Sequence, residues 1–132
     1  DKLFYEKKLS GHTKFKGNKI ATAARILLNR LVLETFENKK YKIHCYAGNI
    51  SGVMYPEGDV YPCELLGKEH KIGNIRDFEL DFKKLWLSTK GDDVRSFIKD
   101  TKCFCTHECF NHANIIFNPK IYPSLIKEVL SL

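Results

Sequence analysis

The feature that most constrains this chain is the stretch DTKCFCTHECFNHAN, which places Cys103, Cys105 and Cys109 within seven residues. The protein has only two other cysteines, Cys45 and Cys63. An isolated cysteine is most often a small buried hydrophobe, which is the simplest interpretation of Cys45 taken alone. Three thiols this close together indicate instead that they share a ligand.

The cysteine count also bears on the compartment. Five is an odd number, so a disulfide framework would leave one thiol over. The chain opens with DKLFYEKKLSG, which has neither the apolar segment nor the cleavage site of a signal peptide and resembles the middle of a longer protein. We therefore expect a cytoplasmic protein, in which clustered cysteines bind metal or perform redox chemistry.

Size and charge exclude several classes. The 132 residues suffice for one domain with a modest core. No apolar run approaches the roughly 20 residues of a membrane span, so no membrane partner is expected. The net charge of +6 comes from scattered lysines interspersed with acidic residues, without a dense basic stripe, and predicts no nucleic-acid partner.

Helical periodicity begins at Asn18, a candidate N-cap, after an irregular or extended lead-in over residues 1–17. The pattern ends in the polar run ENKK and predicts a helix of about five turns that faces the core. Its predicted core positions recur at three- and four-residue steps: Ile20, Ala24, Leu27, Leu28, Leu31, Val32, Thr35 and Phe36.

A β-hairpin is predicted between Cys45 and Cys63, because PEGD has turn chemistry and Gly58 stands where a tight turn requires positive φ. The hairpin would fold back the 17 intervening residues and bring the two thiols together. We expect a second turn at residues 73–74, and the cysteine cluster as a loop. Further helices are expected over 81–87, over 93–99 after a cap at Asp92, and from Pro123 or Ser124 onward. The predicted fold class is α+β.

The two groups of cysteines can be joined in one metal centre. Zinc and iron–sulfur clusters both accept four cysteines. Structural zinc sites favour pairs separated by two to four residues, and neither 45/63 nor 103/105 has that form. The longer, uneven spacing therefore favours an iron–sulfur cluster, with zinc as the alternative.

The stretch CYAGNISGVMYPEGDVYPC resembles the auxiliary-cluster motif of the SPASM and twitch domains, which follow the catalytic barrel of many radical S-adenosylmethionine enzymes. That motif is a cysteine, nine to fifteen residues, a glycine, four residues and a cysteine. Here twelve residues separate Cys45 from Gly58, and DVYP leads to Cys63. IGNI, KKLWLST and CFCTHEC resemble the family too, and the resemblance spans about 41–118. Five cysteines suffice for one cluster only, as in the shortened twitch type.

The resemblance implies one [4Fe-4S] cluster that supports substrate binding and electron transfer. It implies as partners the radical S-adenosylmethionine barrel of the same parent chain and a peptide or small-molecule substrate. The three-cysteine motif that binds S-adenosylmethionine does not occur here. That cofactor is therefore expected only in the missing barrel, and this chain is expected to be inactive alone. Residues 1–40 would join the barrel, residues 41–118 bind the cluster, and residues 119–132 form a terminal helix.

The predicted ligands are Cys45, Cys63, Cys105 and Cys109. Three residues separate Cys105 from Cys109, which would let the loop wrap one edge of a cluster, so Cys103 is the possible substitute. One alternative is a zinc-stabilised binding or scaffolding domain without a redox role. Because an aerobically prepared fragment could lose iron and take up zinc, the two must be distinguished under anaerobic conditions. The other is a thiol protein with CFC as a reactive pair, which is disfavoured because a disulfide across one residue is strained.

Overall fold

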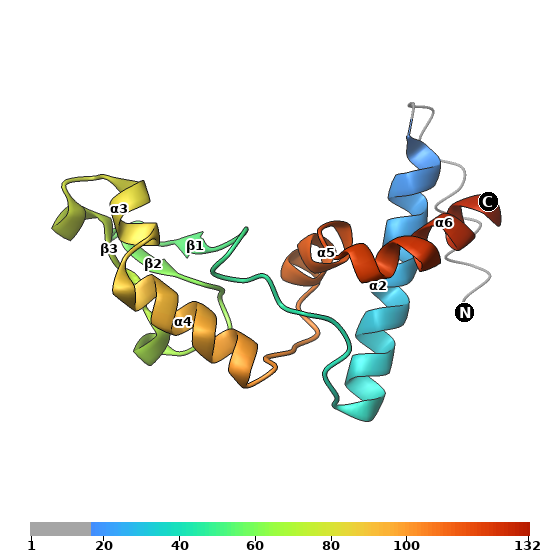
Figure 1. The fold of residues 1–132 in the computed structure, drawn as a ribbon, viewed down its shortest axis with the longest axis horizontal. Coiled ribbons are helices and arrows are strands. Elements are labelled where there is room, and N and C mark those ends of the chain that lie inside the picture. The colour runs from blue at the N-terminus through green and yellow to red at the C-terminus, as the bar shows by residue number, and fades with distance from the viewer. Residues whose placement is uncertain (1–16) are drawn as a thin grey trace. The chain divides into compact units, whose positions relative to one another are not determined.

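The computed structural model describes residues 17–132 and confirms the α+β class (Figure 1). The lead-in predicted over residues 1–17 falls almost entirely outside this range. The helices are α2 (Asn18–Asn38), α3 (Phe82–Trp86), α4 (Thr89–Asp100), α5 (Glu108–Ile116) and α6 (Tyr122–Leu130). The strands are β1 (Val53–Met54), β2 (Asp59–Tyr61) and β3 (Gly73–Asn74), and the 3-10 turns are η1 (Lys68–His70), η2 (Ile75–Phe78) and η3 (Pro119–Ile121).

The chain divides into two compact units. The helical unit combines the described residues up to Ile43 with Cys105–Leu132, and the sheet unit is His44–Phe104. Within residues 17–132, no helix is both long and apolar enough to cross a membrane.

The long helix of the helical unit confirms the predicted periodicity. α2 begins at Asn18, but its N-cap is Gly17, with φ of 96°, so the prediction of Asn18 as the cap was wrong by one residue. At the other end Lys39 adopts φ of 48° and donates its backbone N–H to the Thr35 carbonyl at 2.8 Å. This left-handed residue ends the helix inside the predicted ENKK run.

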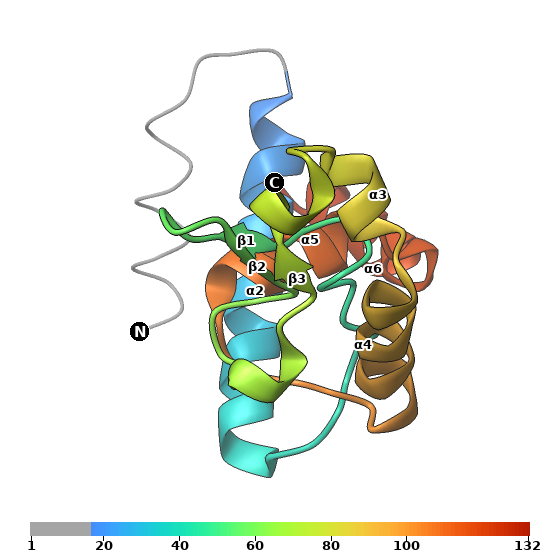
Figure 2. The same cartoon turned by 90° about the vertical axis from the view of Figure 1, so that its left-hand side faces the viewer.

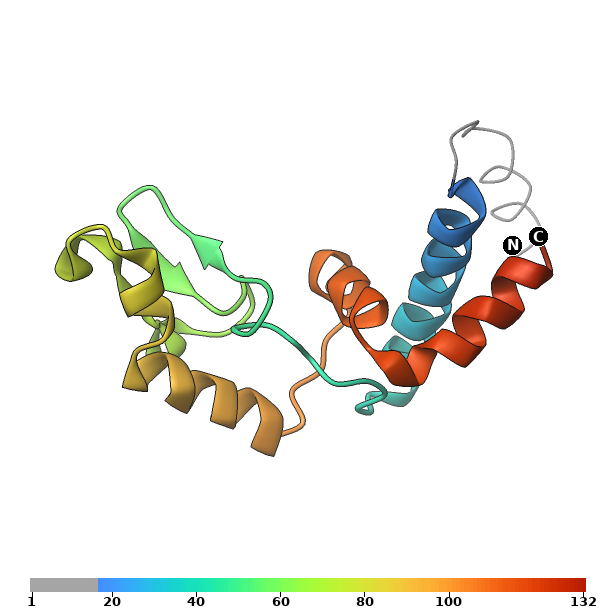
Figure 3. The ribbon, with the colours of Figure 1, turned by 45° about the horizontal axis from the view of Figure 1, so that its top comes forward.

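One face of α2 packs against α5 and α6 (Figure 3). The core of the unit is Leu27, Leu28 and Ile115, and partly buried apolar residues surround it: Leu31, Val32, Ile43, Ile121 and Leu125. Ile20 and Phe36 are exposed, so their assignment to the core was wrong. α5 and α6 have nine residues each against 21 in α2, and helices of that length do not cover the ends of the longer one.

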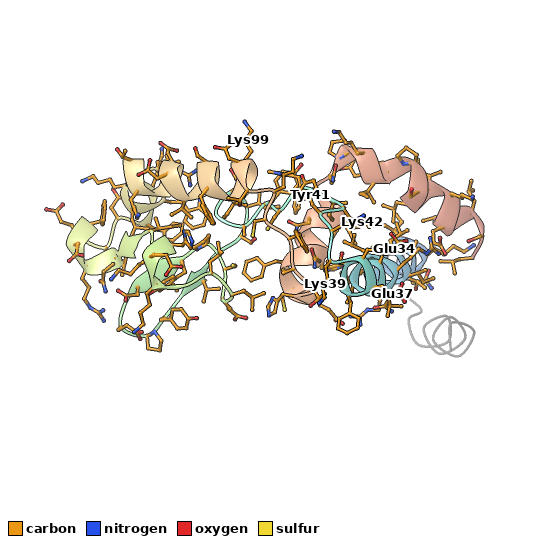
Figure 4. The ribbon with its side chains drawn as sticks, turned by 90° about the horizontal axis from the view of Figure 1, so that it is seen from below. Glu34, Glu37, Lys39, Tyr41, Lys42 and Lys99 are labelled. Atoms are coloured by element: carbon orange, nitrogen blue, oxygen red, sulfur yellow. The ribbon has the colours of Figure 1, made fainter. Side chains whose placement is uncertain are left out.

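Two ion pairs connect α2 to other parts of the described helical unit. Arg30 Nη2 of α2 lies 3.3 Å from Glu128 Oε2 of α6, whose side chain is largely buried. Lys42 Nζ lies 3.2 Å from Glu34 Oε2, which holds the chain beyond α2 against the last turns of the helix (Figure 4). The helix predicted near Pro123 is confirmed as α6, which begins one residue earlier with Pro123 in its first turn.

The predicted hairpin is confirmed in the sheet unit. β1 and β2 are antiparallel, with Val53 opposite Tyr61 and Met54 opposite Val60, and Gly58 has φ of 91°. The prediction of a turn at 73–74 was wrong, because these residues form β3 beside β2 (Figure 2). Glycine and asparagine favour turns locally, but pairing with β2 overrides that preference.

Side chains from beyond β2 secure the hairpin tip. Asn74 Nδ2 donates to Asp59 Oδ1 at 2.7 Å and to the Glu57 carbonyl at 3.0 Å. Lys71 Nζ also donates to Asp59 Oδ1, at 3.1 Å, and Arg76 Nη1 donates to the Glu57 carbonyl. The hydrogen bonds from Asn74 and Lys71 lower the pKa of the Asp59 carboxyl below its ordinary value. The tip is therefore held by polar contacts in one geometry.

Alanine at Gly58 is expected to lower the free energy of unfolding by about 1–3 kcal/mol, the cost of a strained backbone conformation. A Cβ there would also lie 2.6 Å from Arg76 Nη1 and 2.9 Å from Asn74 Oδ1. Urea unfolding of identically prepared proteins measures the change. Gly67→Ala is the matched control, because Gly67 has φ of −67° and the atoms nearest to its new Cβ are those of the exposed Glu69 carboxylate, the far end of a flexible side chain. Equal losses in the two variants would contradict the role given to Gly58.

The two short helices of the sheet unit are confirmed, with one correction. Asp81 caps α3 by accepting from the Lys84 backbone N–H at 3.0 Å. α4 begins at Thr89, four residues earlier than predicted, and its cap is Ser88, whose Oγ accepts from the Gly91 N–H at 3.2 Å. Asp92 was the wrong cap, because it already lies inside the first turn.

Candidate metal centre

The two cysteines that flank the hairpin are the most buried of the five. Cys45 is 7% exposed and Cys63 is 9% exposed. Cys45 precedes a tight turn that leads into β1, and Cys63 follows β2 by two residues. Both therefore lie where the prediction put them, on the two chain segments that the hairpin joins.

The turn after Cys45 is closed by backbone hydrogen bonds. The Asn49 N–H donates to the Tyr46 carbonyl at 2.9 Å, and the Gly48 N–H donates to the Ser51 carbonyl at 2.8 Å. Gly48 has φ of 77°, and a Cβ there would lie 3.3 Å from Pro62 Cβ. Gly48 is three residues after Cys45 and Pro62 directly precedes Cys63, so the two cysteine-bearing segments lie side by side at this point.

Cys103 belongs to the same unit. It follows α4, and its N–H donates to the Ile98 carbonyl at 3.0 Å after Lys102, which has φ of 51°. This left-handed residue ends α4 and fixes the direction in which the chain leaves the helix. The Cys103 side chain is half-buried.

Cys105 and Cys109 belong to the helical unit. The prediction of a loop over the whole cluster was wrong for Cys109, which is exposed in the first turn of α5. Cys105 remains in the loop, and its carbonyl accepts from Asn111 Nδ2 at 2.9 Å. Asn111 is buried, and its Oδ1 in turn accepts from Asn114 Nδ2 at 3.3 Å.

Asn111 is a residue that sequence reasoning missed. Buried asparagine is uncommon unless it is hydrogen-bonded. Asn111 and Asn114 lie three residues apart on one helical face beside Phe110 and Ile115, which is the available signal. By binding the Cys105 carbonyl, Asn111 ties the cysteine loop to α5.

The predicted ligand set takes Cys45 and Cys63 from the sheet unit and Cys105 and Cys109 from the helical unit. Among residues 17–132, neither unit by itself gathers three histidine, cysteine, aspartate or glutamate side chains that could hold a metal ion. The choice of these four, with Cys103 as the possible substitute, stays a prediction.

The donor chemistry fits an iron–sulfur cluster. Cysteine thiolate is the usual protein ligand of such clusters, and five cysteines leave one to spare after a set of four. Cys45 and Cys63 are both buried, and solvent exposure is one of the factors that set the reduction potential of a cluster.

Comparison with known families gives the decisive observation. Residues 45–110 match the sequence model of the SPASM family, described as an iron-sulfur cluster-binding domain, and this is half of the chain. The chain belongs to the SPASM family. The SPASM match begins at Cys45 and ends one residue after Cys109, so it contains all five cysteines. Neither a curated protein nor a solved structure matches the chain.

The SPASM assignment confirms the predicted resemblance and indicates iron–sulfur cluster binding. The predicted boundaries of the SPASM domain, 41–118, and of its flanking segments, 1–40 and 119–132, stay predictions.

Proposed function

We propose that this chain holds one [4Fe-4S] cluster and acts as the accessory domain of a radical S-adenosylmethionine enzyme. The observation that carries the proposal is that the SPASM match contains every cysteine of the chain. Four thiolates are needed for one such cluster, and the fifth cysteine does not suffice for a second. When bound, the cluster would supply a site that accepts or releases one electron.

In this proposal the chain's own residues bind the cluster and hold its ligands in position. Cys45, Cys63, Cys105 and Cys109 are the proposed ligands. The Gly58 hairpin brings the segments of the first two together, and Asn111 holds the loop of the third through its carbonyl. Hydrogen bonds from backbone amides to cluster sulfur tune the reduction potential of such clusters.

The proposed partners are the barrel of the same parent chain and a peptide or small-molecule substrate. The chain itself lacks the three-cysteine motif that binds S-adenosylmethionine in that class of enzyme. The proposed division of labour is that the barrel generates the radical, while this chain holds the auxiliary cluster beside the substrate.

Anaerobic reconstitution of the full chain with iron and sulfide tests the cluster. We expect about four iron and four sulfide per chain and a brown protein that absorbs broadly near ~400 nm. Zinc, a d¹⁰ ion without redox chemistry, would give a colourless protein. A chain that takes up zinc but no iron or sulfide under these conditions would instead support the zinc-stabilised scaffolding domain.

The accessory role has its own test. The reconstituted chain, incubated with S-adenosylmethionine and a strong reductant, is expected to form no 5′-deoxyadenosine above a cluster-free control, because it lacks the barrel motif. Formation of 5′-deoxyadenosine by this chain alone would overturn the accessory role, while leaving cluster binding in place.

A further inference from the structure

Arg95 of α4 stands out among the charged residues of the sheet unit, because its side chain is only 15% exposed and makes three hydrogen bonds. Nη1 donates to the Gly48 carbonyl at 2.9 Å and to the Trp86 carbonyl at 3.0 Å. Nη2 donates to Asp92 Oδ1 at 2.8 Å. The guanidinium therefore connects α4 to the end of α3 and to the turn that follows Cys45.

Both carbonyls need a donor from outside their own segment. Trp86 is the last residue of α3, and the final carbonyls of a helix have no partner within it. Gly48 is buried in its turn, and a buried carbonyl without a donor is costly. A planar guanidinium presents several donors in fixed directions, whereas a lysine ammonium is a compact point charge and a poor substitute at a site with several acceptors.

The turn held by Arg95 is packed on several sides. A Cβ on Gly48 would lie 3.6 Å from Arg95 Cγ and 3.7 Å from Ile98 Cδ1, in addition to its contact with Pro62. A Cβ on Gly52 would lie 2.7 Å from the Trp86 ring. Arg95 thus fixes the Gly48 carbonyl, at the point where the Cys45 segment meets the Cys63 segment.

We propose that Arg95 is a positioning residue for the iron–sulfur cluster. It holds the 46–51 turn so that Cys45 and Cys63 are presented together before any metal arrives. This inference rests on the proposed function for its cluster readouts, while its effect on the turn can be measured in the metal-free chain.

The test compares Arg95→Lys with Ser88→Ala in the full chain. Ser88→Ala removes the N-cap of the same helix and is expected to lower the melting temperature by roughly 4 °C without releasing Gly48. In Arg95→Lys, amide hydrogen exchange over 46–51 is expected to accelerate about tenfold or more, since hydrogen bonds to a charged donor are lost. Ser88→Ala should leave exchange in that turn unchanged. Arg95→Gln, which keeps a planar donor group, is a second variant in case Arg95→Lys folds poorly.

The cluster readouts are iron content after anaerobic reconstitution and the electron paramagnetic resonance spectrum of the reduced protein. We expect the Arg95 variants to bind several-fold less iron and to show shifted g values, and Ser88→Ala to match the wild type in both. The proposal is overturned if the Arg95 variants match the wild type in iron content and in their electron paramagnetic resonance spectrum. It is also overturned if Ser88→Ala loses as much iron as the Arg95 variants do. If the wild type itself takes up no iron, the proposed function fails, and hydrogen exchange over 46–51 alone decides whether Arg95 positions the turn.

Discussion

Serine in place of Cys45 or Cys63 is expected to remove most of the iron that the reconstituted protein binds. Both side chains are almost fully buried, on segments that lie side by side at Gly48 and Pro62. Loss of a partner that merely orients a metal ligand already costs about 10–100-fold in metal affinity, so loss of the ligand atom should cost more. Iron and sulfide per chain, measured after anaerobic reconstitution, report the result.

The same substitution at the remaining cysteines completes the assignment. Cys105→Ser and Cys109→Ser are expected to lose iron as Cys45→Ser does, while Cys103→Ser keeps most of it. Cys103→Ser is the matched control, because it removes a thiol two residues from Cys105. Loss of the cluster in Cys103→Ser together with its retention in Cys105→Ser would show that the loop ligands are assigned the wrong way round.

Removal of the cluster is expected to lower the melting temperature of the chain by about 10 °C or more. A cluster that binds both Cys45 and Cys63 closes the 17 intervening residues into a loop, and a covalent link across a loop of that size stabilises by about 3 kcal/mol. For a chain of 132 residues this corresponds to a shift on the order of 10 °C. The sheet is small, with strands of two or three residues, so its own hydrogen bonds and packing contribute little to the stability of the sheet unit.

Thermal unfolding followed by circular dichroism, before and after anaerobic chelation of the iron, measures this shift. Cys45→Ser, treated with chelator in the same way, is the control, because it has no cluster to lose and should melt unchanged. Identical melting of the loaded and the chelated wild-type protein would show that the fold is self-sufficient, and the coupling of cluster binding to folding would then be wrong.

The features that the sequence determined by itself are those encoded by neighbouring residues. The periodicity of α2 and the hairpin around Gly58 were predicted correctly, because helical spacing and turn chemistry are properties of consecutive residues. The spacing of Cys45, Gly58 and Cys63 likewise carried the family resemblance that the SPASM match confirms.

Errors arose where two local signals competed. Ser88 and Asp92 are both good N-caps, and the choice between them depends on where α3 ends and on Arg95, which binds the Asp92 carboxylate. The nine-residue α5 was missed because its sequence begins inside a cysteine cluster that resembles a loop. Helices this short are marginal alone, and packing against α2 stabilises this one.

Contacts between residues far apart in the chain could be established only from the folded structure. Gly73 and Asn74 became a strand because β2 offered unpaired backbone groups, which no local propensity reveals. Arg95 reaches the Gly48 carbonyl across 47 positions of sequence. In the sequence Arg95 is one of many scattered basic residues. Every residue has a backbone carbonyl, so the residue type of the acceptor gives no sign of this hydrogen bond.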